Sequence, residues 1–381
     1  MTIQSIYEQA IQADVSGVAV KSRLQRAKKL SENYNNFVFM KREDTQSVFS
    51  FKCRGAYNKI RQLSNSEKSV GIIAASAGNH AQGVALSAYQ LNLEATIIMP
   101  VTTPSIKVDA VKKLGAKVIL FGDSYDDAYE HALLLSHDEG FTFIHPYDDP
   151  KVIAGQATIA LEIIDQLSEP IDYIFVAVGG GGLLAGILAV FKTISPKTIV
   201  VAVEPENSNC LSAALEANER VSLDSVGIFA DGVAVKQIGE ETFNLIQPHI
   251  DDSILVSIDD ICAAIKDIYD ETRSVVEPAG ALSLAGMKDY IKKHNITDKN
   301  IVTINCGANM NFDRLRHVAE RAEIGEEKEA IYVVNIPEEP GSLKSFCSII
   351  GKRTITEFNY RFQKKDEAMI FVGFSISDLN D

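Results

Sequence analysis

The sequence predicts an α/β protein with two lobes built on parallel β-sheets, followed by a small α+β module. Short apolar runs rich in Ile and Val alternate with helical patterns through about the first 310 residues. Apolar residues follow one another in these runs instead of alternating with polar ones, which is typical of strands buried on both faces of a parallel sheet. After about residue 330 the pattern changes to strand, helix, strand, strand, which indicates a separate α+β unit.

Length and charge limit the function. A chain of 381 residues is long enough for two or three domains. Its 37 basic and 51 acidic residues give a net charge of -14, which disfavours nucleic acid or an anionic membrane as partner and favours a small metabolite. The five cysteines are scattered and form no C-x-x-C pair. They indicate neither a disulfide framework nor a zinc site, and predict a reducing, cytoplasmic location.

The elements follow in chain order. An N-terminal helical pattern at 3–11 contains Glu8, unlike a signal peptide. The strand-like runs are 70–74, 95–99, 117–121, 174–178, 198–203 and 301–304. The helical patterns between them are 83–91, 106–114, 126–135, 152–166, 183–191, 208–217, 258–268 and 279–291. Several strand and helix units precede about residue 150 and several follow it, so we expect two lobes with a cleft between them.

Domain boundaries follow from these patterns. We expect a catalytic domain at 1–320, in which the smaller lobe spans roughly 53–150. The segment 321–329 (RAEIGEEKE) is charged and lacks apolar periodicity, so we interpret it as a linker. The α+β module then occupies 330–381.

A run of four glycines at 179–182 interrupts the longest uncharged stretch, 173–191. The stretch is as long as a membrane span, but the glycines divide it into a strand, a turn and a helix. We therefore expect no membrane span. Backbone N–H groups of the turn and the positive end of the helix would converge on a phosphate. There are two alternatives for this run. One is a dinucleotide site, in which Gly186 would complete the fingerprint and Glu204 would be the acidic residue, and the other is a tight structural turn.

Two further segments carry potential chemistry. Lys52 stands between an aromatic residue and small residues at the start of a helical pattern. Partial burial would lower the pKa of its amine and make it a nucleophile towards a carbonyl cofactor; the alternative is a solvated surface lysine. The segment 76–80 lies between a buried strand and a helix, where free N–H groups could receive a carboxylate. An ordinary helix start capped by Ser76 or Asn79 is the alternative.

From about residue 22 to 378, the chain resembles the biosynthetic threonine dehydratases, which are pyridoxal-phosphate enzymes of fold type II, the class of the tryptophan synthase β-subunit. The resemblance implies a two-lobed fold type II core with parallel sheets. It rests on the segments KRED (41–44), SFKCRGA (50–56), ASAGNHAQG (75–83), GGGG (179–182), FADGVAV (229–235), EPAGAL (277–282) and NCGANMNF (305–312).

The resemblance implies pyridoxal 5'-phosphate as the cofactor. Lys52 matches the lysine that forms the Schiff base and later acts as the base. Asn79 matches the residue that hydrogen-bonds the ring hydroxyl, and Phe51 matches the aromatic residue beside the cofactor. The residues that match the phosphate loop are Gly179, Gly180, Gly181, Gly182 and Leu183.

Cys306 matches the serine or cysteine that faces the pyridine nitrogen. A thiol there would leave the ring neutral, which suits β-elimination; on its residue type alone, Cys306 could also be a small buried hydrophobe. The loop matching the one that receives the substrate carboxylate comprises Ser76, Ala77, Gly78, Asn79 and His80. Some related serine-acting enzymes bind a divalent cation through an acidic residue upstream of the Ala-Asp-Gly segment. Residues 226–229 include no acidic residue, so we expect no such metal site.

The implied reaction is dehydration and deamination of L-threonine to 2-oxobutanoate and ammonia, the first step towards isoleucine. A serine or catabolic threonine dehydratase is one alternative, which the C-terminal module disfavours. A cofactor-free amino-acid sensor on the same fold is another. We also expect a homo-oligomer, either a dimer or a tetramer.

The module at 330–381 resembles the ACT-like regulatory module of this family, which has the order βαββαβ. The chain supplies β, α, β and β, so we expect either a truncated module or one that pairs with another subunit. The missing helix would leave Ile331, Val333, Ile370 and Val372 at risk of exposure.

The family's effector is isoleucine. Phe346 and Tyr360 are candidates for its pocket, and plain core packing is their alternative. An incomplete module would transmit little coupling energy. We therefore expect threonine turnover that barely responds to isoleucine, and a protease-sensitive tail beyond about Arg321.

Overall fold

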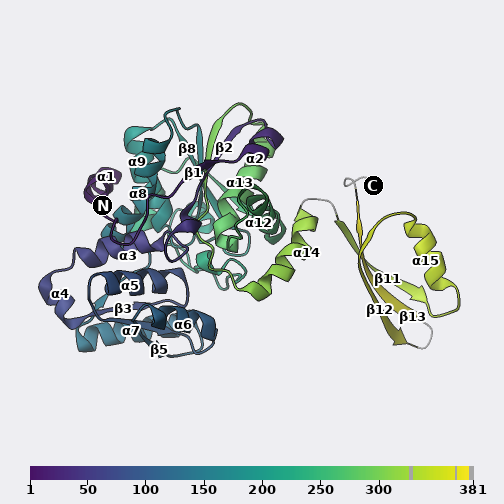
Figure 1. Cartoon of the computed structure of the whole chain (residues 1–381), viewed down its shortest axis with the longest axis horizontal. Coiled ribbons are helices and arrows are strands. Elements are labelled where there is room, and N and C mark those ends of the chain that lie inside the picture. Colours follow the sequence, from purple (N-terminus) through teal and green to yellow (C-terminus); the bar gives the residue numbers. More distant parts are fainter. Residues whose placement is uncertain (326–328, 365–366, 377–381) are drawn as a thin grey trace.

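Two β-sheets form the two lobes of the core (Figure 1). The computed structural model of the chain describes residues 1–325, 329–364 and 367–376. The large sheet has the order β1-β2-β10-β7-β8-β9, and only β1 runs antiparallel to its neighbour. The small sheet has the order β5-β4-β3-β6 and is parallel throughout. The strands are β1 (Leu24–Arg26), β2 (Phe37–Lys41), β3 (Ile72–Ala75), β4 (Ala95–Met99), β5 (Lys117–Leu120), β6 (Thr142–Phe143), β7 (Tyr173–Ala177), β8 (Ile199–Pro205), β9 (Asp252–Val256) and β10 (Asn300–Ile304).

Each lobe buries its own hydrophobic core, which confirms the predicted two-lobed α/β class. Helix α3 lies between the lobes, against α5 of the small lobe and α8 of the large one. The helices of the core are α1 (Ile3–Gln12), α2 (Lys28–Asn33), α3 (Lys52–Arg61), α4 (Asn65–Val70), α5 (Asn79–Gln90), α6 (Ser105–Lys113), α7 (Tyr125–Glu139), α8 (Pro150–Gln166), α9 (Gly182–Ile194), α10 (Cys210–Ala217), α11 (Glu240–Ile246), α12 (Ile258–Thr272), α13 (Pro278–His294) and α14 (Leu315–Gly325), with short 3-10 turns η1 (Glu43–Thr45), η2 (Asp231–Val233) and η3 (Phe312–Arg314).

Local signals start the main helices. The Asp149 side chain caps α8 by accepting from the N–H groups of Lys151 and Val152, and Pro150 follows it at the first helical position. Ser257 and Asp260 form a capping box at the start of α12. The uncharged stretch becomes β7 and α9, and both are buried in the large lobe. Among the described helices, none combines the length and apolar character needed to cross a bilayer.

The predicted strands and helices are all present, with ends shifted by a few residues. Four strands were not predicted. β1 and β6 contain only three and two residues, too few to show a period. β2 ends in Lys41, a charged residue that is buried because of an ion pair with Glu162. β9 is an edge strand with a partly exposed pattern, so it lacks a continuous apolar run.

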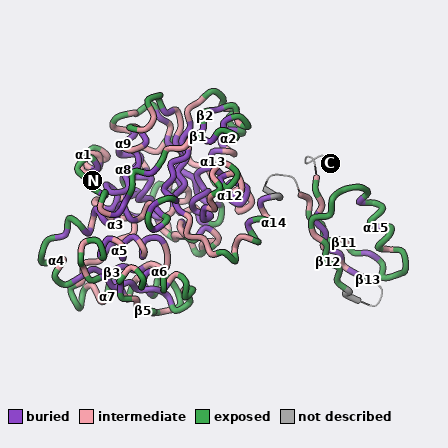
Figure 2. The backbone as a smooth tube through the Cα atoms, in the orientation of Figure 1, coloured by how far each residue is buried: buried purple, intermediate pink, exposed green. Residues whose placement is uncertain are grey.

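The C-terminal module contains β11 (Glu329–Pro337), α15 (Ser342–Ile350), β12 (Ile355–Lys364) and β13 (Glu367–Ser375). This is the predicted order β, α, β, β. The strands form an antiparallel sheet in the order β11-β13-β12, with α15 packed on one face. Buried residues are concentrated in the two lobes, whereas many residues of the module are exposed (Figure 2).

Two expectations about this region are met only in part. The segment 321–329 was expected to be a linker, but α14 continues to Gly325 because Val318 and Ala322 are buried and Arg321 pairs with Asp259 of α12 at 2.5 Å. Residues 326–328 lie outside the described part, and β11 begins at Glu329.

The second expectation concerned exposure of the sheet. Ile331 and Val333 are exposed as expected, at 38% and 60%. Ile370 and Val372 are fully buried, because they lie on the face that α15 covers.

Candidate active site

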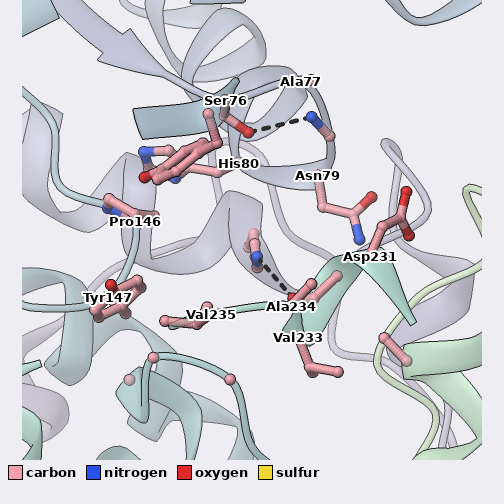
Figure 3. A pocket seen from close by; sticks show the side chains of 18 of the residues that line it. Ser76, Ala77, Asn79, His80, Pro146, Tyr147, Asp231, Val233, Ala234 and Val235 are labelled. Atoms are coloured by element: carbon pink, nitrogen blue, oxygen red, sulfur yellow. Dashed lines mark hydrogen bonds between the residues drawn. The ribbon is translucent and has the colours of Figure 1, made fainter. Parts of the chain in front are cut away.

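A cavity of about 1210 Å³ has walls from both lobes. It is lined by every residue for which the sequence predicted a catalytic, cofactor-binding or substrate-binding role: Phe51, Lys52, Ser76, Ala77, Gly78, Asn79, His80, Gly179, Gly180, Gly181, Gly182, Leu183 and Cys306. In Figure 3, Asn79 and Asp231 project from one side of this cavity and Pro146 and Tyr147 from the other. Loops at the carboxyl ends of the parallel strands supply much of this lining, as expected for open α/β sheets.

Lys52 is the first residue of α3. Its Nζ donates to the carbonyl oxygen of Gly232 at 3.4 Å. Burial lowers the pKa of its amine, while nearby Glu277 and Asp231 act in the opposite direction. The start of α3 lies close to α5 at Gly83, where an added Cβ would be 3.1 Å from the backbone of Cys53. Any larger residue there would push the two helices apart by a few tenths of an ångström, so the glycine favours their close approach.

The glycine loop connects β7 to α9. Gly181 has a φ of +93°, a conformation that favours glycine. The carbonyl of Gly180 is turned into the protein, where it accepts from Thr242 Oγ1 at 2.8 Å and from the N–H of Gly239 at 3.3 Å. Within the described residues, the N–H groups from Gly179 to Leu183 donate to no protein acceptor. Free, largely buried donors at a helix start fit the phosphate of the implied cofactor.

The ring of Tyr147 packs against the glycine loop at Gly180. A Cβ added to Gly180 would lie 2.3 Å from three ring atoms of Tyr147. The loop therefore packs directly on an aromatic ring, and a side chain at Gly180 would force the two apart.

The dinucleotide interpretation of the loop does not fit the structure. The Glu204 carboxylate is buried and accepts from the N–H groups of Leu211 and Ser212 and from the Ser212 hydroxyl, so it holds the start of α10. Gly186 packs against α8, where an added Cβ would lie 2.9 Å from the Ile153 carbonyl oxygen. Neither residue lines the cavity.

The loop that was predicted to receive the substrate carboxylate, residues 76–80, connects β3 to α5. The N–H of Gly78 donates to Ser76 Oγ at 3.2 Å, and the N–H groups of Ala77, Asn79 and His80 donate to no acceptor among the described residues. A Cβ added to Gly78 would meet nothing within 4 Å. Free donors beside open space at a helix start fit a carboxylate.

The imidazole of His80 is not suited to bind a carboxylate. Its Nε2 is 2.8 Å from the carbonyl oxygen of Ile144, and burial lowers its pKa to about 3. The ring therefore stays neutral, and His80 could contribute only its backbone N–H to carboxylate binding.

Cys306 follows β10 and is buried beside the cavity. Burial raises the pKa of its thiol, so the group stays protonated and neutral at physiological pH. The N–H of Phe51 donates to the Cys306 carbonyl oxygen at 3.3 Å. This bond ties the segment before Lys52 to the end of β10.

Four residues that were assigned no role from the sequence also line the cavity: Glu277, Asn309, Asp231 and Tyr147. Burial, followed by the nearby charge of Asp231, raises the pKa of Glu277 to about 7. Asp231 pairs with Lys107 of α6 at 2.7 Å, which links the two lobes. A signal existed for three of the four, because Asp231, Glu277 and Asn309 each lie in a segment that carried the family resemblance. Tyr147 had none.

The two candidate regulatory residues lie in the C-terminal module. Phe346 is buried in the core of the module, whereas Tyr360 is exposed and donates its hydroxyl hydrogen to Glu338. Over the described residues, no group of three or more His, Cys, Asp or Glu side chains is placed to hold a metal ion.

Comparisons with known proteins identify the family of the chain. A family model described as pyridoxal-phosphate dependent enzyme matches residues 15–307, and one for the C-terminal regulatory domain of threonine dehydratase matches residues 320–381. The chain is 51% identical over 379 residues to the biosynthetic L-threonine dehydratase of Burkholderia multivorans, covering 99% of this chain and 75% of that protein. It is also 51% identical over 367 residues to the corresponding Escherichia coli enzyme, covering 96% and 71%.

A solved structure is similar over most of both chains. The processed form of threonine deaminase isoform 2 from Solanum lycopersicum matches with a TM-score of 0.83 and 48% identity, covering 84% of this chain and 88% of that one. This likeness confirms the predicted fold type II core. The chain belongs to the biosynthetic threonine dehydratases, a family of pyridoxal-phosphate dependent enzymes with a C-terminal regulatory domain.

Proposed function

We propose that the chain is a threonine ammonia-lyase that converts L-threonine to 2-oxobutanoate and ammonia with pyridoxal 5'-phosphate. One observation carries the proposal. A lysine with a lowered pKa and two helix starts with free N–H groups line the same cavity. A non-catalytic sensor is not favoured, because sensing would not require a reactive amine beside two anion sites.

Four groups would hold the cofactor. The Lys52 amine would bond its carbonyl carbon, and the free N–H groups of the 179–183 loop would bind its phosphate. Asn79 Nδ2 donates one N–H to Glu277 Oε1, and its second N–H would donate to the ring hydroxyl. The neutral thiol of Cys306 would face the ring nitrogen. When bound, pyridoxal phosphate supplies a sink for the electron pair left on the substrate α-carbon.

The protein's own groups would orient the substrate and move its proton. The start of α5 would bind the threonine carboxylate through the free N–H groups of Ala77, Asn79 and His80 and so fix the position of the α-carbon. The Lys52 Nζ, once released, would take the α-proton, and burial favours its unprotonated form. Loss of the β-hydroxyl as water gives an unsaturated amine, and hydrolysis of that amine consumes one water and releases ammonia. The net reaction therefore consumes no water.

We extend the proposal to regulation, assembly and location. Isoleucine is the proposed effector, and Tyr360 is better placed than Phe346 to contact it, because Phe346 is buried in the module core. A homo-oligomer, dimer or tetramer, is the proposed assembly. All five cysteines are free, which supports a cytoplasmic location. Calorimetric titration of the protein and its Tyr360→Ala variant with isoleucine tests the effector site.

Lys52→Ala tests the function itself. The variant should lose threonine turnover by several orders of magnitude, since the other described lysines along the cavity wall, Lys107 and Lys236, are held in ion pairs with Asp231 and Asp126. Borohydride reduction of the wild-type holoenzyme, followed by mass spectrometry, should locate a phosphopyridoxyl group on Lys52. Lys59→Ala is the matched control, because Lys59 lies on the same helix but pairs with Asp149 outside the cavity at 2.6 Å. Labelling of a different lysine, or an active Lys52→Ala variant, would contradict the proposal.

A further inference from the structure

The side chain of Asn79 is held from both ends. Its Nδ2 donates to Glu277 Oε1 at 2.6 Å, and its Oδ1 accepts from Asn309 Nδ2 at 2.7 Å. Asn309 also donates to the Val48 carbonyl oxygen at 2.8 Å. An amide nitrogen carries two hydrogens, so one N–H of Asn79 stays free beside the cavity.

The two partners distinguish one end of the amide from the other. The oxygen and nitrogen of an asparagine amide have almost the same shape, so a half-turn of the group would exchange them. Here the half-turn would place the amide oxygen against a carboxylate oxygen of Glu277 and the N–H groups of Asn79 against those of Asn309. Both hydrogen bonds would be lost in a buried setting, where unpaired polar groups are costly.

Both partners are themselves fixed by the backbone. Glu277 is 3% exposed and stands directly before α13, and its N–H donates to the Gly307 carbonyl oxygen at 3.1 Å. A Cβ added to Gly307 would lie 2.4 Å from Glu277 Oε1, so glycine leaves the space that the carboxyl occupies. Asn309 lies on the same loop after β10. The orientation of Asn79 therefore depends on two segments of the large lobe, although Asn79 itself opens a helix of the small lobe.

We propose that Glu277 and Asn309 are positioning residues for the cofactor, which hold the Asn79 amide so that its free N–H faces the ring hydroxyl. This inference rests on the proposed function, in which Asn79 binds pyridoxal phosphate. It assigns no direct cofactor contact to Glu277 or Asn309. Their effect on the cofactor passes through Asn79.

A double-mutant cycle tests this dependence. Asn309→Ala and Glu277→Ala are made in the wild-type and in the Asn79→Ala background. The dissociation constant of pyridoxal phosphate is measured by dialysis of the apoprotein, together with the absorption maximum of the bound cofactor. In the wild-type background each substitution should weaken binding about tenfold, the usual scale for one buried hydrogen bond, and shift the absorption band. In the Asn79→Ala background neither should weaken binding further by more than about twofold.

The controls separate positioning from general damage. Glu204→Gln alters another buried carboxylate, one that lies away from the cavity, and should leave the dissociation constant unchanged. Melting of each apoprotein shows whether it folds, and the Asn309→Ala arm completes the cycle if Glu277→Ala does not fold. Equal losses in both backgrounds would overturn the proposal. Failure of the proposed function would look different, because the wild-type apoprotein would then not bind pyridoxal phosphate.

Discussion

Replacing Arg54 with methionine is expected to destabilise the protein by about 3–5 kcal/mol, the usual cost of removing one partner of a buried ion pair. The Arg54 guanidinium is fully buried. Its five N–H groups lie within hydrogen-bond distance of six acceptor atoms: both Glu43 carboxylate oxygens at 2.8 Å, both Glu162 carboxylate oxygens at 2.7 and 3.0 Å, and Thr158 Oγ1 and the Val20 carbonyl oxygen at 3.1 Å.

The carboxylates left behind determine the magnitude. Glu162 would keep its ion pair with Lys41 at 2.5 Å. Glu43, which is fully buried, would keep only uncharged donors, Ser22 Oγ and Gln46 Nε2. An unpaired charge in the core is the main cost. The double variant Arg54→Met/Glu43→Gln should therefore recover part of the lost stability, because it removes that charge.

Urea unfolding of the apoprotein, followed by far-ultraviolet circular dichroism, measures the change. Lys236→Met is the matched control, since it breaks the ion pair with Asp126, in which both side chains are about half exposed; we expect a loss of about 0–1 kcal/mol there. Arg54 lies one helical turn or less from Lys52, so Arg54→Met should also lose activity at a lower temperature than the control. A loss no larger than that of Lys236→Met would refute the view that the Arg54 network stabilises the start of α3.

Three further outcomes are expected. Cys306→Ser should keep threonine turnover within a few-fold of wild type. Cys306→Asp would place a carboxylate near the ring nitrogen and should lower kcat by two or more orders of magnitude, roughly the scale of one active-site electrostatic interaction. An active Asp variant would contradict this expectation. Gly180→Ala should destabilise the glycine loop by about 1–3 kcal/mol through its clash with Tyr147 and weaken cofactor binding. Gly78→Ala, by contrast, should keep the cofactor and raise KM for threonine, because its Cβ meets open space. Burial raises the pKa of Glu277 to about 7 from 4.5, so its stabilising contribution is complete below about pH 4.5 and is lost as the pH rises through about 7. Apoprotein melting at about pH 5 and about pH 8 should therefore show Glu277→Gln gaining up to about 3 kcal/mol relative to wild type at the higher pH; a pH-independent difference would contradict the assignment.

The sequence predicted the type and order of most elements, because these depend on local signals. Apolar runs marked the strands at 95–99 and 174–178, and helical periodicity predicted α8 and α12 to within a few residues. Where local signals were absent, prediction failed. The charged segment 321–329 shows no periodic pattern, yet α14 continues through the first residues of this segment to Gly325. It does so because Val318 and Ala322 are buried and Arg321 pairs with Asp259 of α12.

The candidate site residues could be chosen without the tertiary structure. Lys52, the glycines at 179–182 and the loop at 76–80 were identified from residue type, spacing and family resemblance. The tertiary structure decided how these groups are held. β2 pairs with β10, more than 250 residues away, and Asn79 bonds Glu277 across 198 residues. Such pairings leave no local signal, because periodicity reports whether a side chain is buried but not which distant side chain it meets. The path of the chain through both lobes therefore decided the orientation of Asn79.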